Sequence, residues 1–215
     1  FAPGLTYSGD KKTALFNTAL SAAKKSDAIL FFGGEEWILS GEGQCRGEIN
    51  MPGAQTELID LLAKTGKPLI VIVMAGRPLA IGNELEDADA LLYAWHGGTM
   101  AGPAVADLLF GKESPSGKLP VTFVKGSGQI PFYYYRNNTG RPATESSWTP
   151  IDSIPIENPQ NSLGYKSYQL DYGYTPLLPF GFGLSYSDFE YSNFSLSALS
   201  MDLSGSIVAK ATIRN

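Results

Sequence analysis

The chain has 215 residues, of which 43% are hydrophobic and 12% aromatic, a composition typical of a folded globular protein that excludes general disorder. Its formal charge of −5 and its lack of a long lysine or arginine cluster exclude nucleic acid as an expected partner, because neutralising phosphates needs concentrated positive charge. One cysteine excludes an internal disulfide, and one cysteine with one histidine is too few for a usual zinc site, so we expect no metal.

The sequence also lacks the marks of a membrane protein. No apolar run approaches the roughly 20 residues that a membrane span needs. The N-terminus does not show the basic-then-apolar pattern of a signal peptide, so we expect a mature or excised piece with no membrane partner. The length suits one full core and the start of a second domain, because domains commonly have about 100–150 residues.

The N-terminal half begins with alternating helix and strand patterns. Apolar residues at helical spacing predict an amphipathic helix over 10–25, and an apolar run at 28–32 predicts the first buried strand. A second helix is predicted over 55–63, ending before Gly66. The continuous apolar run at 69–74 is typical of a strand buried on both faces of a parallel sheet.

The same order of elements continues to Gly111. A short acidic link at 83–88 leads to a third predicted strand over 90–95, and residues 96–99 open a helix that reaches Leu109. Repeated strand, loop and helix units fold into a mostly parallel sheet flanked by helices. The predicted fold class is therefore α/β, an α/β sandwich.

The pattern changes beyond Gly111. A turn-rich link leads to a short predicted strand over 121–124, and residues 136–176 show no helical period. A loop of that length suggests a functional lid or a surface wrapped against something else. Alternating segments at 189–199 and 207–213 predict antiparallel strands, and because a hairpin cannot bury a core alone, we expect the beginning of a truncated antiparallel β-sandwich.

A polar, acidic, glycine-rich loop over residues 33–52 joins the first strand to the helix at 55–63. Open α/β sheets place ligand chemistry in loops of this kind. Glu42 lies between Gly41 and Gly43, which allow the backbone to present the carboxylate at a cleft. From the residues alone, Glu42 is either a solvated loop glutamate or a catalytic acid/base, and the pattern favours the first.

Three further side chains of this loop are candidates for substrate contact. Glu35 could hold a ligand hydroxyl or anchor the loop, and the second role is favoured. Trp37 could stack on a sugar, because an aromatic face packs against pyranose C–H groups, or it could cover the core. Arg46 could pair with a loop glutamate or tune the acidity of Glu42.

Other reactive residue types point less clearly to chemistry. The only histidine, His96, has no serine or cysteine in triad-like order, so a structural role is favoured. Residues 97–99 could bind an anion at a helix N-terminus. They lack the Gly-Lys-Ser/Thr ending of a P-loop and the spaced glycines of a dinucleotide site, so we expect no cofactor. Cys45 is most simply a small loop residue.

A series of short motifs occurs in order along nearly the whole chain: Gly34-Glu35, Ser40-Gly41-Glu42-Gly43 with Arg46, Met51-Pro52-Gly53 with Gln55, Gly76-Arg77-Pro78-Leu79, Ala106-Asp107-Leu108-Leu109-Phe110-Gly111, Ser116-Gly117-Lys118-Leu119-Pro120, Thr139-Gly140-Arg141-Pro142 and Pro179-Phe180-Gly181-Phe182-Gly183. Together they resemble the second domain of glycoside hydrolase family 3, the β-glucosidase and β-xylosidase group.

The resemblance implies an α/β sandwich over residues 1–187, carrying the acid/base loop and the long 136–176 loop. Residues 188–215 would begin an incomplete fibronectin type III-like domain. The implied activity is that of a retaining, exo-acting β-glycosidase, most simply a β-glucosidase, in which one carboxylate attacks the anomeric carbon and another acts as acid and then base. The matching acid/base is Glu42.

The same resemblance places the nucleophile, an aspartate, on a (β/α)₈-like barrel that is absent from this chain. The chain alone is therefore expected to be inactive. The implied partners are a β-linked oligosaccharide or glycoside and the barrel, which would close over Glu42. A homodimer is left open, and a periplasmic or secreted location is favoured over a cytoplasmic one.

Two departures from the family pattern lie where the cleft is expected. Gln44-Cys45 stands where relatives commonly have an aromatic residue and an aspartate, and His96-Gly97-Gly98 replaces an aromatic-Pro-Gly turn. The alternative function is a non-catalytic carbohydrate-binding or interaction module, in which the 136–176 loop docks a partner and the loop glutamates bind sugar without chemistry. A flavodoxin-like binding domain is disfavoured because no phosphate loop is evident.

Overall fold

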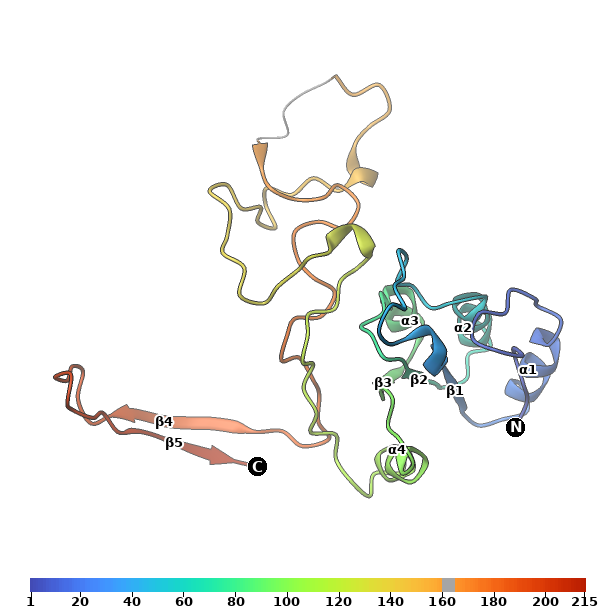
Figure 1. Cartoon of the computed structure of the whole chain (residues 1–215), viewed down its shortest axis with the longest axis horizontal. Helices are drawn as coiled ribbons and strands as arrows, with labels where there is room; N and C mark the ends of the chain where they lie inside the picture. The colour runs from blue at the N-terminus through green and yellow to red at the C-terminus, as the bar shows by residue number, and fades with distance from the viewer. Residues whose placement is uncertain (160–164) are drawn as a thin grey trace.

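The computed structural model describes residues 1–159 and 165–215 (Figure 1). A three-stranded parallel sheet lies in the N-terminal half, with β1 (Ile29–Gly34), β2 (Leu69–Met74) and β3 (Ala90–Tyr93) in the order β1-β2-β3. The strand with the most continuous apolar run, β2, is central, and its Val71 pairs with strands on both sides. The predicted parallel sheet is confirmed.

Four helices accompany this sheet in the described residues: α1 (Phe16–Ala23), α2 (Gln55–Ala63), α3 (Gly82–Asp87) and α4 (Ala101–Leu109). The helix α2 has the predicted bounds. It ends before Gly66, which has a φ of +71° and so takes a left-handed conformation that suits glycine.

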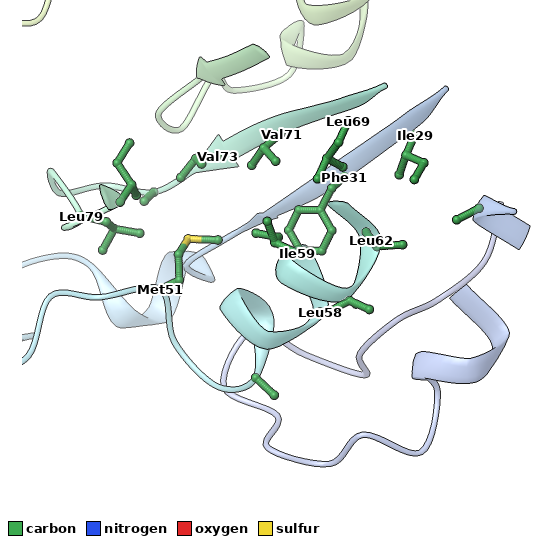
Figure 2. Packing of buried hydrophobic residues seen from close by; sticks show 14 of the residues in the cluster. Ile29, Phe31, Met51, Leu58, Ile59, Leu62, Leu69, Val71, Val73 and Leu79 are labelled. Carbon is green, nitrogen blue, oxygen red and sulfur yellow. The ribbon is translucent and has the colours of Figure 1, made fainter. Parts of the chain in front are cut away.

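The main core lies between α2 and the sheet. Leu58, Ile59 and Leu62 of α2 are buried, and Figure 2 shows Ile59 on the side of the helix that faces Phe31 of β1. Burying one side chain of this size contributes about 1.5–3 kcal/mol to folding. Since neighbouring strand residues point to opposite faces, Phe32 of β1 lies on the other face, where it is 55% exposed.

The first helix begins later than predicted, at Phe16 instead of residue 10. Asp10 is used in a turn: its carboxylate accepts hydrogen bonds from the Thr6 hydroxyl (2.5 Å) and the Lys12 amide (2.9 Å). These hydrogen bonds, the Thr6 hydroxyl's first, hold the pKa of the Asp10 carboxyl below its usual range. The Asp10 carbonyl also accepts from the Ala54 amide (2.8 Å), so this turn is tied to the start of α2.

Other parts of the fold also differ from the sequence prediction, among them the helix predicted to open at 96–99, which begins at Ala101. The acidic link at 83–88 is helical, as α3, which is too short to show an apolar period. The third strand ends at Tyr93, because Trp95 turns the backbone with a φ of +53°. The predicted strand 121–124 is wrong: Phe123 makes a single bridge with Leu178, whose segment lies between two prolines that cannot extend a ladder.

In the described parts of the long loop, residues 136–159 and 165–176, the chain forms the short 3₁₀ turn η3 (Ile151–Ser153). The rest of the prediction for this segment, residues 160–164, falls outside the described residues. The chain ends in an antiparallel pair, β4 (Glu190–Leu196) and β5 (Ala209–Arg214), which confirms the predicted strands. Every residue of the pair except Ser192 is exposed, and Figure 1 shows it as a separate ribbon.

No helix among the described residues is both long and apolar enough to cross a membrane.

Candidate active site

The 33–52 loop leaves the carboxyl end of β1 and returns beside the segment that follows β2. It contains the 3₁₀ turn η1 (Trp37–Leu39). On its return, Asn50 forms a parallel bridge with Ala80, and the Ala80 amide donates to the Ile49 carbonyl at 2.9 Å. The loop therefore lies at the edge of the sheet where open α/β folds bind ligands.

Gln55, the first residue of α2, holds the two ends of the loop together. Its side-chain oxygen accepts from the Gly34 amide at 2.7 Å, and its side-chain nitrogen lies 2.8 Å from the Gly34 carbonyl and 3.0 Å from the Pro52 carbonyl. Gln55 is 2% exposed, and these bonds satisfy its buried amide. The Gln55 side chain thus fixes where the loop starts and ends.

Glu35 occupies the centre of the loop's base. Its side chain is 0% exposed, and its two carboxylate oxygens bind two arginines: one accepts from Arg46 Nη1, the other from Arg77 Nε at 3.0 Å. A buried carboxylate of this kind is tolerable only when paired and hydrogen-bonded. Arg46 also donates to the Asn50 carbonyl at 3.0 Å, which ties the returning arm of the loop to the same cluster.

Arg77 makes a second set of contacts, to the main chain of the loop. Its Nη2 donates to the carbonyl of Leu39 and, at 2.8 Å, to the carbonyl of Gln44. These two carbonyls stand on either side of the segment 40–43, which contains Glu42. We call the residues from Leu39 to Gln44 the acid/base turn, after the role that the family resemblance implies for Glu42. One arginine therefore joins the two ends of this turn.

The backbone around Arg77 is itself supported from β3. The Tyr93 hydroxyl donates to the Arg77 carbonyl and accepts from the Leu79 amide at 3.1 Å. Burial, the main cause, raises the pKa of the Tyr93 phenol above its usual value, so the group stays a neutral donor. Beside it, Gly76 leaves room for Ser40, because a Cβ at Gly76 would overlap the Ser40 hydroxyl.

The tip of the acid/base turn is exposed. Gly41 and Gly43 have φ values of +135° and +75°, conformations that favour glycine. Glu42 between them is exposed, and among the described residues its carboxylate has no hydrogen bond or ion pair within the chain. Trp37 is 76% exposed at the start of η1, so it does not cover the core.

The structure separates the four residues predicted for the site into two groups. Glu35 and Arg46 bind each other at the base, in the anchoring arrangement that the sequence also allowed, while Glu42 and Trp37 lie on the exposed part of the loop. Sequence reasoning assigned no role to Arg77. The available signal was its place after β2, since the carboxyl ends of neighbouring parallel strands, here those leading to Glu35 and Arg77, meet at one edge of the sheet.

Other reactive groups add no metal site. Among residues 1–159 and 165–215, no group of three or more His, Cys, Asp and Glu side chains gathers closely enough to hold a metal ion. Cys45 and His96 are both exposed.

Residues 6–186, most of the chain, match the model of the glycosyl hydrolase family 3 C-terminal domain. The chain belongs to glycosyl hydrolase family 3. It is 41% identical over 202 residues to a periplasmic beta-glucosidase of Salmonella typhimurium, and 37% identical over 200 residues to a beta-xylosidase of Formosa agariphila. These alignments cover 94% and 93% of this chain.

Solved structures of the family show the same fold. A beta-glucosidase from Listeria innocua in complex with isofagomine superposes with a TM-score of 0.82 at 34% identity, over 96% of this chain and 27% of that one. The resemblance inferred from the motifs and the predicted α/β class are thus confirmed. This family 3 chain spans about a quarter of the length of the curated relatives it matches, 25% in each of the two named above.

Proposed function

We propose that this chain supplies the general acid/base of a retaining, exo-acting β-glycosidase, most simply a β-glucosidase, and that Glu42 is that residue. The observation that carries the proposal is how the four glutamates of the 33–52 loop are used. Glu35 is buried between two arginines, Glu36 accepts from the Ser8 amide at 3.3 Å, and Glu48 accepts from the Ser127 hydroxyl at 3.5 Å. Of the four, Glu42 alone has no such partner among the described residues.

The proposed reaction has two steps. In the first, the Glu42 carboxylic acid donates its proton to the glycosidic oxygen as the C–O bond breaks, while an aspartate attacks the anomeric carbon and forms a glycosyl ester. In the second, the Glu42 carboxylate takes a proton from water, whose oxygen attacks the anomeric carbon and releases the aspartate. The aspartate would come from a barrel domain outside this chain.

Substrate contacts are proposed for the neighbours of Glu42. Trp37, being exposed, has a free aromatic face for the leaving-group sugar. Arg46 keeps a 21% exposed side chain beside Glu35, so its guanidinium can reach a ligand hydroxyl while holding the loop. Glu35 would act on the ligand only through Arg46, since its own side chain is 0% exposed.

The remaining parts of the proposal concern the longer protein. We assign residues 1–187 to the α/β sandwich and 188–215 to the start of a fibronectin type III-like domain, which the end of the family match at residue 186 supports. The expected substrate is a β-linked oligosaccharide or glycoside, and the expected partner is the barrel; without it the chain would be inactive. The Salmonella relative is a periplasmic beta-glucosidase, which favours a periplasmic or secreted location for the complete protein, whose proposed assembly includes a homodimer as one form.

The test is Glu42→Ala in the full-length protein. Removing a general acid/base lowers turnover of a natural disaccharide by roughly 10²–10⁴-fold. With an activated aryl glycoside, azide should restore the rate by attacking the glycosyl ester directly. Glu48→Ala, in the same loop, is the matched control and should keep full turnover. A Glu42→Ala protein with full turnover of disaccharides would refute the assignment.

The second candidate function is a non-catalytic carbohydrate-binding or interaction module. The observation that favours it is a group of aromatic side chains next to the 136–176 loop. Tyr134 stacks on Phe180 with ring centroids 4.5 Å apart, and the neighbouring Tyr135 is 67% exposed. Under this function, Tyr134→Ala would weaken sugar or partner binding, whereas Glu42→Ala would leave every measured activity unchanged.

A further inference from the structure

The acid/base turn has few internal contacts. Its main-chain hydrogen bond runs from the Gln44 amide to the Gly41 carbonyl at 3.1 Å. A Cβ placed on Gly41 or Gly43 would meet no atom within 4 Å, so the tip of the turn stands clear of its surroundings. The position of Glu42 therefore depends on what holds the ends of the turn.

Arg77 holds both ends at once. Because Nη2 donates to the Leu39 and Gln44 carbonyls, a single nitrogen fixes the start and the end of the turn relative to each other. Two glycines in the turn make its backbone adaptable, and such a backbone keeps one conformation only when it is held from outside.

Arg77 is in turn fixed relative to the sheet. Its Nε binds Glu35, whose side chain is 0% exposed, and its own carbonyl accepts from the Tyr93 hydroxyl. The guanidinium presents its donors in a rigid planar fork, so the direction of Nε toward Glu35 also sets the direction of Nη2 toward the turn. A lysine ammonium cannot make both sets of contacts.

We propose that Arg77 is a positioning residue for the general acid/base: it transmits the fixed geometry of β1, β2 and the buried Glu35 to the Glu42 carboxylate through the two ends of the acid/base turn. This inference rests on the proposed function, in which Glu42 protonates the leaving group. Arg77 itself, behind the turn, touches main-chain oxygens and Glu35.

The test uses Arg77→Met in the full-length protein and compares kcat/KM for a natural disaccharide with kcat/KM for an activated aryl glycoside. Both constants report the first step, which needs the acid only when the leaving group is poor. The ratio of the two does not depend on the fraction of folded protein, so partial unfolding cannot change it. We expect the ratio of kcat/KM for the disaccharide to kcat/KM for the aryl glycoside to fall roughly 10–100-fold. A catalytic group misplaced by about 1 Å, here the Glu42 carboxylate, causes losses on this scale.

Three companion variants make the result decisive. Arg77→Lys should show the same fall, since it keeps the charge without the fork. Arg214→Met, at an exposed arginine in β5, should keep the wild-type ratio. Glu42→Ala should lower the ratio at least as far as Arg77→Met does, and azide should raise kcat for the aryl glycoside in both.

The possible failures are distinct. A wild-type ratio in Glu42→Ala would refute the proposed function itself. A lowered ratio in Glu42→Ala together with a wild-type ratio in Arg77→Met would leave Glu42 as the acid/base and overturn the role of Arg77.

Discussion

Glu35 and Arg77 follow two neighbouring parallel strands and meet at the carboxyl edge of the sheet, where Arg77 Nε lies 3.0 Å from Glu35 Oε2. The glutamate side chain of this pair is 0% exposed and the arginine side chain 19% exposed. The pair therefore fastens the loop after β1 to the segment after β2, out of contact with bulk water on the carboxylate side.

Removing the Glu35 carboxylate should lower the free energy of unfolding substantially. Glu35→Ala leaves Arg46 and Arg77 without their shared partner, and breaking a buried ion pair on one side destabilises a protein by about 3–5 kcal/mol. The measurement is the free energy of unfolding of the full-length protein in urea. Glu57→Ala, at an exposed glutamate in α2, is the control and should change it by less than about 0.5 kcal/mol. Equal effects of the two variants would contradict a buried ionic anchor.

Gln55→Leu should loosen the ends of the 33–52 loop. The Gly34 amide would lose its 2.7 Å hydrogen bond and remain buried, at a cost of about 1–3 kcal/mol for an unsatisfied group. We expect faster hydrogen exchange over residues 33–52 and an unchanged rate in the β4–β5 pair. Unchanged exchange in the loop would show that other contacts hold its ends.

Two glycine substitutions should differ sharply. At Gly34, with a φ of +125°, a Cβ would overlap the Met74 backbone at the end of β2, whereas at Gly43, with a φ of +75°, it would meet nothing within 4 Å. Gly43→Ala should therefore cost only backbone strain, of order 1–3 kcal/mol. Gly34→Ala should cost more and lower the thermal midpoint further, and similar midpoints for both variants would contradict this geometry.

Stability should depend on pH through Glu84, which is 2% exposed in α3 and accepts a hydrogen bond from the Thr56 hydroxyl. Burial, the largest cause, raises the pKa of the Glu84 carboxyl above its usual 4.5. Between 4.5 and that raised value the folded state binds more protons than the unfolded state, so this group's contribution to stability falls as pH rises through the window.

The check is Glu84→Gln, which keeps a hydrogen-bond acceptor for Thr56 and removes the charge. The measurement is the difference in urea midpoint between the variant and the wild type. This difference should favour the variant more at pH 7 than at pH 4. Other carboxyls, such as Asp10 with its lowered pKa, titrate in both proteins and cancel in the comparison. A difference that stays constant with pH would contradict an ionising Glu84.

The parts of the fold predicted from the sequence are those with a long, uniform pattern. The strand at 69–74 and the helix at 55–63 were predicted with their observed bounds, because the strand is apolar at every position and the helix keeps one apolar period along its length. The helix α3 has only six residues, and its buried Glu84 resembles a surface residue in sequence. The predicted strand at 121–124 was wrong because the segment around Leu178, which pairs with Phe123, cannot extend the ladder beyond one bridge.

The sequence predicted which residues belong to the site more fully than it predicted which of them bind each other. The sequence placed Glu35, Glu42 and Arg46 on one loop, and the family resemblance singled out Glu42. Which glutamate binds which arginine depends on contacts between residues far apart in sequence, such as the one from Arg77 to Glu35. No local pattern specifies such a pair, since it exists only once β1 and β2 lie side by side.

Among the described residues, the hydrogen bonds from Arg77 to the acid/base turn end on main-chain oxygens, those of Leu39 and Gln44. The side chains at positions 44 and 45 are therefore free to change during evolution without disturbing how the turn is held, and both are exposed. Gln44 and Cys45 can therefore be substituted without removing either hydrogen bond from Arg77 to the turn. The surface of the turn can in this way change its chemistry while the two anchoring carbonyls keep their place.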